Sequence, residues 1–242
     1  MTRPHVLITG TARGIGAALA HHFATSGWLV SGVDLGAGAV ENPEYRHYRA
    51  DIVDEDALGA AFEAAAGRGP FTAVIGNAAL TDLDHRPATE LDYRVWQRIM
   101  RVNIDGAFLT GRLAGRHMRR QGRGNIVFVT SSLAFLDQAK ADDAPYCASK
   151  SAVEMFARVL ALELADAGVN VNTLFPSVKI DTGFFAHLSE AERETLARPD
   201  LLDETALFLA GLAPGALTGI SLDQQRWDDD KTYRDTLAGA AS

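Results

Sequence analysis

The sequence predicts an α/β fold in which helices cover both faces of a doubly wound, parallel sheet of about seven strands. Two observations lead to this class. Short apolar runs alternate with longer stretches of helical period along the chain, which is the pattern of repeated βαβ units. Most of the runs also lack polar alternation, as expected of strands that are buried on both faces. No internal repeat and no Pro/Gly/Ser linker interrupts the pattern, so we expect one domain over residues 1–222 and a tail over 223–242.

The predicted elements follow one another in order along the chain. Strands are expected at Val6–Thr9, Leu29–Val33, Ala73–Ile75, Ile126–Thr130, Val169–Phe175 and Gly219–Leu222. Between the first two, Ile15, Leu19 and Phe23 repeat every four residues, which predicts an amphipathic helix that stops at Gly27. Further helices are expected near Asp54–Ala66, Glu90–Arg120, Ser149–Ala167 and Asp203–Leu212, with surface loops or lids at Gly36–Pro43 and Asp181–Pro199.

Charge and composition narrow the class of protein. The formal net charge of −8 repels phosphate backbones, so we expect no nucleic-acid partner. No apolar run approaches the roughly 18 residues of a membrane span, and the run after Pro4 is too short for a secretory signal. The single cysteine, Cys147, excludes an intramolecular disulfide and a cysteine-built zinc site. We therefore expect a cytoplasmic protein with neither a membrane segment nor a bound metal.

A glycine-rich turn follows the first strand. The segment Thr9–Gly16 carries Gly10, Gly14 and Gly16, and a helix is predicted to begin at once. Glycines let backbone amides approach a pyrophosphate closely, and a helix N-terminus adds unpaired N–H donors. The Gly-x3-Gly-x-Gly spacing differs from the usual Gly-x-Gly-x-x-Gly fingerprint, and such a turn alone is weak evidence. Its place between a strand and an amphipathic helix favours a Rossmann-like dinucleotide cradle.

The second strand ends in a carboxylate, Asp34, 24 residues after Gly10. A carboxylate there can accept hydrogen bonds from the adenosine ribose hydroxyls and would repel a 2′-phosphate. Arg13 argues the other way, because a cation near the ribose could hold such a phosphate. We give Asp34 the greater weight, since a misplaced carboxylate rejects phosphate while an arginine can be solvated elsewhere. The predicted cofactor is therefore NAD, with NADP less favoured.

Tyr146 and Lys150 are four residues apart at the start of a predicted helix, so they share one helix face. A phenol that titrates near 10 must lose about two to three pKa units for proton transfer near neutrality, roughly 3–4 kcal/mol. One cation at about 4 Å supplies roughly 4 kcal/mol at an effective dielectric near 20. Lys150, helped by the charge of a bound cofactor, is sufficient in magnitude. The spacing also arises by chance, so the pair needs supporting residues.

Support comes from the strand before this helix, which ends in Thr130-Ser131-Ser132 at the carboxyl edge of the sheet. Open α/β folds place their ligands at this edge. A serine there can hydrogen-bond a substrate oxygen, although a lone serine at a strand end is more commonly a capping or turn residue. A serine, Tyr146 and Lys150 together would make a proton-transfer site.

Together these residues resemble the short-chain dehydrogenase/reductase family over nearly the whole chain, to about Leu222. Thr9–Gly16 is similar to its Thr-Gly-x3-Gly-Ile-Gly motif, and Gly76–Ala79 is similar to its Asn-Ala-Gly segment. The resemblance implies catalytic roles for Asn103, Ser132, Tyr146 and Lys150. It implies cofactor contacts from Gly10, Arg13, Gly14, Ile15, Gly16, Asp34, Leu35, Asp51, Ile52, Asn77, Ala78, Ala79, Thr130, Tyr146, Lys150, Pro176, Ser177, Val178, Ile180 and Thr182.

The implied reaction is hydride transfer between NAD(H) and a secondary alcohol or ketone. In this reaction Tyr146 exchanges the proton as general acid/base, and Ser132 holds the reacting oxygen. Lys150 lowers the tyrosine pKa and binds the nicotinamide ribose, and Asn103 supports a water that relays protons. Ser132 precedes Tyr146 by 14 positions, about one more than is common in the family, which leaves Ser131 as the alternative.

This sequence departs from the family pattern at several positions. Ala79 replaces a glycine, Ser177 replaces the glycine after the family proline, and Lys179 lengthens the segment that ends at Thr182. The register of Val178 and Ile180 therefore stays open. The pair Asp142-Asp143 is interpreted as a solvated loop, and Lys179 either faces an anionic group or lies on the surface.

Other functions and the assembly are considered on the same residues. A sensor or scaffold that binds NAD without turnover is the alternative, and retention of all the catalytic residues counts against it. An epimerase or dehydratase of the larger related enzymes would need a substrate domain for which the chain leaves little room. We expect a homodimer or homotetramer, because the helices at Glu90–Arg120 and Ser149–Ala167 are of the kind that the family packs across a two-fold axis. The tail with Trp227 either reaches a neighbouring subunit or covers the active site.

Overall fold

A single sheet is the centre of the fold. The computed structural model describes residues 3–185 and 187–241, and within these ranges seven strands form one sheet in the order β3-β2-β1-β4-β5-β6-β7. The strands are β1 (His5–Thr9), β2 (Leu29–Asp34), β3 (Tyr45–Arg49), β4 (Ala73–Gly76), β5 (Gly124–Val129), β6 (Val169–Phe175) and β7 (Ser221–Asp223). Every pairing is parallel, so the prediction of a doubly wound parallel sheet with about seven strands is confirmed.

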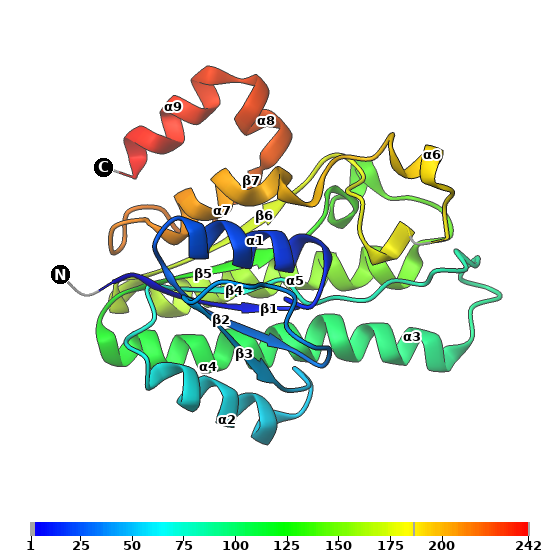
Figure 1. The fold of residues 1–242 in the computed structure, drawn as a ribbon. Helices are drawn as coiled ribbons and strands as arrows, with labels where there is room; N and C mark the ends of the chain where they lie inside the picture. Colours follow the sequence, from blue (N-terminus) through cyan, green and yellow to red (C-terminus); the bar gives the residue numbers. More distant parts are fainter. Residues whose placement is uncertain (1–2, 186, 242) are drawn as a thin grey trace.

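Helices cover both faces of this sheet (Figure 1). α1 (Gly14–Thr25) and α7 (Asp203–Ala210) lie on one face, and α2 (Glu55–Ala66), α4 (Gly106–Gln121) and α5 (Ala144–Leu164) lie on the other. The strands bury side chains on both faces, since Val6 and Ile8 join the cluster of α1 and α7 while Leu7 joins that of α2, α4 and α5. Burying one such side chain contributes about 1.5–3 kcal/mol.

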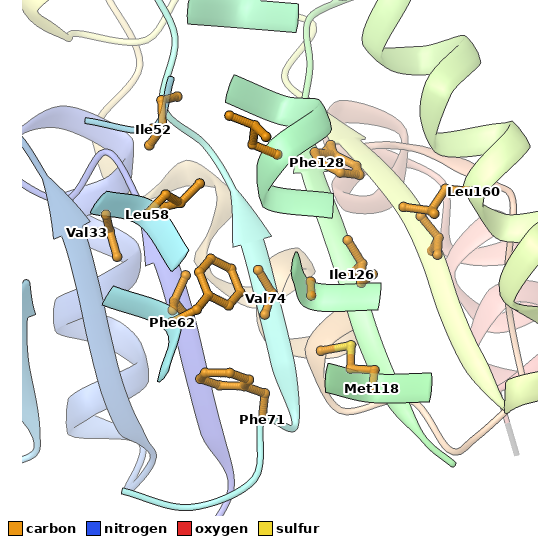
Figure 2. Close-up of a cluster of buried hydrophobic side chains, with 14 of the residues drawn as sticks. Val33, Ile52, Leu58, Phe62, Phe71, Val74, Met118, Ile126, Phe128 and Leu160 are labelled. Atoms are coloured by element: carbon orange, nitrogen blue, oxygen red, sulfur yellow. The ribbon is translucent and has the colours of Figure 1, made fainter. Parts of the chain in front are cut away.

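Figure 2 shows the core beneath α2, α4 and α5. Phe62 of α2, Phe71 before β4 and Met118 of α4 are each at most 2% exposed. The rings of Phe62 and Phe71 lie 5.7 Å apart between centroids at an interplanar angle of 72°, close to the favoured edge-to-face arrangement. Phe128 of β5 and Leu160 of α5 belong to the same cluster. This packing fixes α4 and α5, which carry side chains of the site, against the sheet.

The strand β3 has no counterpart among the predicted runs. Its sequence, Tyr-Arg-His-Tyr-Arg, contains no apolar run, because β3 is an edge strand whose side chains are partly exposed. The Tyr45 hydroxyl hydrogen-bonds Thr11 Oγ1 at 3.0 Å, which ties this edge to the glycine-rich turn. A rule for strands that are buried on both faces does not detect such an edge strand.

The long helix predicted at Glu90–Arg120 is divided in the structure. α3 (Tyr93–Met100) begins after Asp92, whose carboxylate caps its first turn. A π-helical segment, Arg101–Asp105, then joins α3 to α4. Such segments widen one helical turn and are frequent at functional sites. Asn103, a predicted catalytic residue, lies at the middle of this π-helical segment.

The residues after β7 fold into two helices, α8 (Gln224–Asp229) and α9 (Lys231–Ala240). The centroid of the Trp227 ring lies 4.6 Å from that of Phe208 on α7. Trp227 therefore packs on its own chain, on the face that α1 and α7 cover, and the two helices contribute no described residue to the cavity of the site. The expectation that this tail covers the active site is wrong in this structure, because α7 offers it an apolar surface.

The segment predicted as a loop at Asp181–Pro199 is partly regular. It contains a short helix, α6 (Glu190–Arg193), while Ala186 lies outside the described residues. Short 3-10 turns occur at Ser132–Ala134, Leu136–Gln138, Ala165–Ala167, Gly183–Phe185 and Pro199–Leu202. In the described part of the chain, no helix combines the length and apolar character needed to cross a membrane.

Candidate active site

A large cavity lies at the carboxyl edge of the sheet. β1 has β2 on one side and β4 on the other, so the strand order reverses its direction there, and open α/β sheets bind ligands at such a point. The cavity has a volume of about 1530 Å³. We call the part around Gly10, Gly14 and Asp34 the cradle end, and the part around Ser131, Tyr146 and Lys150 the catalytic end. Of the predicted site residues, Gly16 and Asn103 are outside its described lining.

The cradle end depends on backbone geometry. Gly10 and Gly14 have φ angles of +79° and +57°, in the left-handed region that favours glycine. A Cβ on Gly16 would lie 2.0 Å from the carbonyl oxygen of Gly10, so only glycine fits there and its role is to allow this close approach. α1 begins at Gly14 without a side-chain cap, which leaves its first N–H groups available to an anion. This geometry fits a dinucleotide pyrophosphate.

The end of β4 is tied to the cradle end by Asn77 and Thr9. Thr9 Oγ1 accepts hydrogen bonds from the backbone N–H groups of Asn77 and Ala78, at 3.0 and 3.2 Å. Asn77 Nδ2 donates to the carbonyl oxygens of Thr9 and Gly10, at 3.0 and 3.3 Å. Asn77 therefore fixes the turn that forms the cradle, and the segment Gly76–Ala79 is brought to the cavity as the sequence predicts.

Asp34 and Arg13, which predict opposite cofactors, have different surroundings. The Asp34 carboxylate accepts hydrogen bonds from Ala12 N at 2.9 Å and from Gly36 N at 2.8 Å. These bonds hold it beside the glycine-rich turn. Arg13 is exposed, and a Cβ on Gly183 would lie 3.1 Å from its guanidinium carbon. Arg13 is therefore turned toward the segment Asp181–Pro199, which we call the lid segment. The Asp34 carboxylate is the group that is fixed at the end of β2.

The catalytic end is built on the first turns of α5. The helix begins at Ala144 with Pro145 in its first turn, a position where the missing N–H of proline costs nothing. Lys150 Nζ donates to the carbonyl oxygen of Val129 at 2.8 Å and lies 5.7 Å from the centroid of the Tyr146 ring. The ring of Phe184, in the lid segment, is nearly perpendicular to the Tyr146 ring, and the two ring centroids are 6.0 Å apart. The strand end, α5 and the lid thus converge on the phenol.

Burial sets the pKa values of this pair. Burial raises the pKa of Tyr146 to about 12, against the effect of its hydrogen bond with Ser131, and the negative charge of Asp143 adds to the rise. Burial also lowers the pKa of Lys150 to about 8, with Glu154 opposing. From the sequence, Lys150 is expected to lower the phenol pKa. In the structure, the burial of the phenol is the largest influence on its pKa, and it acts in the opposite direction.

The serine that contacts Tyr146 is Ser131 rather than Ser132. The hydrogen bond of the phenol is with the Ser131 hydroxyl, which also accepts from Leu133 N at 3.2 Å. Ser132 lies in the 3-10 turn that follows, and its backbone N–H donates to Pro176 O at 3.4 Å. The sequence choice counted back from Tyr146 across a loop, and loop lengths vary. Both serines line the cavity, and which of them holds the substrate oxygen stays a prediction.

Asn103 lies beside the cavity. Its side-chain Nδ2 donates to Leu80 O at 2.8 Å and to Ser149 Oγ at 2.9 Å, and its Oδ1 accepts from Leu80 N at 2.7 Å. A second, small cavity of about 10 Å³ is lined by Asn103, Lys150 and Val129, among others. That volume is about what one water molecule needs. The geometry fits the predicted relay through Asn103 to Lys150.

The segment after β6, whose register toward the cofactor stays open, lines the cavity with side chains of different exposure. Val178 is 42% exposed and Ile180 is 4% exposed, and both line the cavity. Ile180 also belongs to the core under α1 and α7. Ser177 Oγ donates to Asp223 Oδ1 at 3.0 Å. Val178 therefore presents its side chain toward solvent while Ile180 anchors the segment in the core.

Sequence reasoning missed two acidic residues around the catalytic end. Glu154, one turn after Lys150, accepts hydrogen bonds from the hydroxyls of Thr130, Thr173 and Ser221. The side chain of Thr130, a predicted cofactor contact, is therefore used to join β5 to α5. Asp143, predicted to be solvated, is only 4% exposed. Its carboxylate contacts His85, which is 58 positions away in the sequence, and no local pattern signals this contact.

Comparisons with known proteins agree with this geometry. The profile of the family described as short chain dehydrogenase matches residues 4–193. Cis-4-hydroxycyclohexanecarboxylate dehydrogenase of Sinomonas cyclohexanicum is 33% identical over 89% of this chain and 92% of its own length. D-Threitol dehydrogenase of Mycolicibacterium smegmatis is also 33% identical, with 89% of each chain covered. A crystal structure of 3-ketoacyl-(acyl-carrier-protein) reductase from Brucella melitensis in complex with NADH has a TM-score of 0.80 at 28% identity, covering 91% of this chain and 96% of that one.

Proposed function

This chain belongs to the short-chain dehydrogenase family, and we propose that it transfers a hydride between NAD(H) and a secondary alcohol or ketone of a polyhydroxylated or hydroxy-acid compound. Membership makes the chain an oxidoreductase that acts on CH–OH groups. The observation that carries the finer proposal is one cavity with the cradle at one end and Ser131, Tyr146 and Lys150 at the other. The two relatives are named for cis-4-hydroxycyclohexanecarboxylate and D-threitol, both of which carry secondary hydroxyls.

Tyr146 is the proton-exchanging residue of this proposal. In oxidation its phenolate oxygen accepts the hydroxyl proton of the substrate as the hydride leaves the same carbon. In reduction the phenol returns the proton to the carbonyl oxygen. Ser131, which already hydrogen-bonds the phenol, holds the substrate oxygen. A bound nicotinamide accepts or donates the hydride and, when oxidised, brings a positive charge.

The residues behind the phenol supply its proton route. Lys150 lies between the Tyr146 ring and the small cavity beside Asn103. A proton released by the phenol can pass through Lys150 to a water in that cavity. Burial raises the pKa of Tyr146 to about 12, which favours the protonated phenol. This is the form that gives a proton to the carbonyl oxygen when a ketone is reduced.

The test of the reaction is direct. Purified protein with NAD(H) is mixed with polyols, hydroxy acids and cyclic alcohols, and with the matching ketones, while the absorbance of the reduced nicotinamide is followed. We expect turnover of at least one secondary alcohol or ketone. Tight NAD binding without hydride transfer to any member of the panel would instead support a non-catalytic sensor, which no comparison favours.

We propose NAD as the preferred cofactor because Asp34 is fixed beside the cradle by two backbone hydrogen bonds. A 2′-phosphate would place two negative groups together there. We expect kcat/KM with NAD to exceed that with NADP by about 10-fold or more, and Asp34→Ser to lower the ratio by at least about 10-fold, equal to about 1.4 kcal/mol. An equal preference in the wild-type protein would overturn this choice.

We also propose that two copies pack through α4 and α5 as a homodimer, or as half of a homotetramer. Met155, Val159 and Leu162 form a stripe on α5 and are 65%, 43% and 75% exposed, with Phe108 of α4 45% exposed. Contiguous exposed apolar side chains mark contact surfaces. Light scattering should give a dimer or tetramer, and Leu162→Glu should shift it toward monomer. Leu136→Glu, at a loop residue that is 99% exposed, is the matched control. A monomeric wild-type protein would contradict the proposal.

A further inference from the structure

A second polar cluster lines the catalytic end and has no part in the proton transfer described above. Its centre is Asp143, which immediately precedes α5 and is 4% exposed. One carboxylate oxygen of Asp143 accepts from His85 Nδ1 at 2.8 Å, and the other accepts from Lys140 Nζ at 2.5 Å. All three residues line the cavity. The side chains of His85 and Lys140 keep exposed fractions of 34% and 50%, so both side chains remain accessible.

The cluster lies next to the reacting groups. The backbone oxygen of Asp143 accepts the hydrogen bond of Cys147 N at 2.9 Å, in the turn of α5 that carries Tyr146. The negative charge of Asp143 also reaches the phenol, where it contributes to the raised pKa of Tyr146. His85 and Lys140 are held to this same carboxylate. They therefore line the catalytic end of the cavity through Asp143.

The hydrogen bonds of the cluster leave donors for a ligand. Asp143 uses both oxygens on His85 and Lys140, so it offers little to a substrate hydroxyl. The ring nitrogen Nε2 of His85 and the remaining N–H groups of Lys140 have no hydrogen-bond partner within the described residues. His85 also has a φ of +49°, a strained conformation for a residue with a side chain, and such strain concentrates at ligand sites.

The charge around the cluster favours an anion. The chain has a net charge of −8 and four lysines by count, of which Lys140, Lys150 and Lys179 line this cavity in the described structure. The acidic lining residues are Asp34 and Asp51, which follow β2 and β3, and Asp143, whose charge Lys140 offsets. The catalytic end is therefore positive on the surface of an acidic protein. Charge-assisted hydrogen bonds to a carboxylate are roughly twice as strong as neutral ones.

We propose that His85 and Lys140, positioned by Asp143, bind a carboxylate of the substrate, so that the enzyme acts on hydroxy acids and their keto acids in preference to neutral polyols. This inference rests on the proposed function, since it names the substrate class of the same site. The carboxylate accepts a hydrogen bond from Lys140 and, with the imidazolium form of the ring, a second one from Nε2 of His85. This leaves the secondary hydroxyl to Tyr146 and Ser131.

The experiment compares substrates that differ only in this group. D-Gluconate and D-glucitol differ by a carboxylate in place of a hydroxymethyl group, and 4-hydroxycyclohexanecarboxylate and 4-(hydroxymethyl)cyclohexanol differ in the same way. We expect the wild-type kcat/KM to be about 10-fold or more higher for the acid in at least one pair. Lys140→Met should lower the value for the acid by about 10-fold or more and leave the neutral partner within about twofold.

Two further variants complete the design. His85→Asn should also lower the kcat/KM for the acidic substrate. Asparagine is chosen because it tolerates the left-handed backbone at this position. Lys231→Met is the matched control, since Lys231 pairs with Asp235 on α9 outside the cavity. It should leave the kcat/KM of both substrates unchanged. The inference would be overturned if the wild-type protein preferred the neutral polyol. It would also be overturned if folded Lys140→Met lost kcat/KM equally for the acid and for its neutral partner.

A binding measurement separates this inference from the proposed reaction. D-Gluconate and D-glucitol are titrated calorimetrically into the protein saturated with NADH. Selective binding of D-gluconate that Lys140→Met weakens about 10-fold supports the carboxylate site even if no turnover is found. Turnover of neutral alcohols without any binding of the acid refutes the carboxylate site and leaves the reaction standing.

Discussion

The two ends of the cavity are built in different ways. At the cradle end the decisive features belong to the backbone: positive φ angles at Gly10 and Gly14, no room for a Cβ at Gly16, and an uncapped start of α1. At the catalytic end they belong to buried side chains, since Lys150 is 5% exposed and its pKa is lowered to about 8. Backbone geometry is recorded in local spacing, whereas burial is a property of the whole fold. In the proposed function, the backbone features would bind the cofactor and the buried side chains would tune the proton transfer.

The largest effect should come from removing the phenol hydroxyl. Tyr146→Phe keeps the ring contact with Phe184 but deletes the proton-exchanging group. General acid–base catalysis contributes about 10²–10⁴-fold, so kcat should fall by that factor while the cofactor Kd changes by less than about threefold. Steady-state kinetics and cofactor titration measure the two quantities. A variant as active as the wild-type protein would mean that the catalytic end works through another residue.

The converse change acts on the cradle end alone. Gly16→Ala would push a Cβ to 2.0 Å from Gly10 O, so the turn must move. We expect the free energy of unfolding to fall by about 1–3 kcal/mol and the cofactor Kd to rise by at least about 10-fold. Chemical denaturation and cofactor titration provide the measurements.

A matched glycine is available as the control for that change. A Cβ on Gly59, within α2, meets nothing within 4 Å. Gly59→Ala should therefore stabilise the protein by about 0.5–1 kcal/mol, because glycine is unfavourable inside a helix, and cofactor binding should stay as it is. If both alanines behaved alike, close approach of the backbone at Gly16 would not be the reason for that glycine.

Burial at the catalytic end should be visible in stability. The pKa of Lys150 is lowered from 10.5 to about 8 in the folded chain, so its charge destabilises the fold at pH 7. Lys150→Met should raise the free energy of unfolding of the protein measured without cofactor by about 2 kcal/mol. This net figure already subtracts the lost hydrogen bond from Lys150 to Val129 O. Between pH 8 and 10.5 Lys150 binds more protons in the unfolded chain than in the folded one. The free energy of unfolding of the wild-type protein therefore rises with pH in this range, and its difference from that of Lys150→Met narrows.

The measurement is denaturant unfolding of both proteins without cofactor at pH 7 and at about pH 9.5, below the range where Tyr146 titrates in the folded chain. A gap that stays constant with pH would show that burial of Lys150 is not the cause. An unstable Lys150→Met variant would show that the hydrogen bond to Val129 O outweighs desolvation.

The smallest effect decides between the two serines. Ser131→Ala removes the hydroxyl that hydrogen-bonds Tyr146 and should lower kcat by about 10-fold or more, as for loss of one hydrogen bond to a reacting oxygen. Ser132→Ala should stay within about threefold of the wild-type value. Parallel kinetics of the two variants are sufficient. The reverse order would restore Ser132 as the serine that holds the substrate oxygen.

Much of the fold could be predicted because it is recorded locally. The apolar stretches within β1, β4 and β5 are uninterrupted because both faces of these strands are buried. The glycine spacing of the first turn reflects φ angles and close approach of the backbone. β3 escaped because an edge strand needs no apolar run. Tyr146 and Lys150 could be found because the helix period places residues four apart on one face.

The sequence by itself determined the parallel α/β class, the cradle with Asp34, and the pairing of Tyr146 with Lys150 on one helix, since each rests on spacing along the chain. Tertiary structure alone decided that Ser131 hydrogen-bonds the phenol, that desolvation raises the pKa of Tyr146 to about 12, and that Asp143 is buried against His85. The physical reason is the same in each case. Burial and the electrostatic field at a group depend on neighbours that the chain brings together from distant positions, and no local pattern contains them.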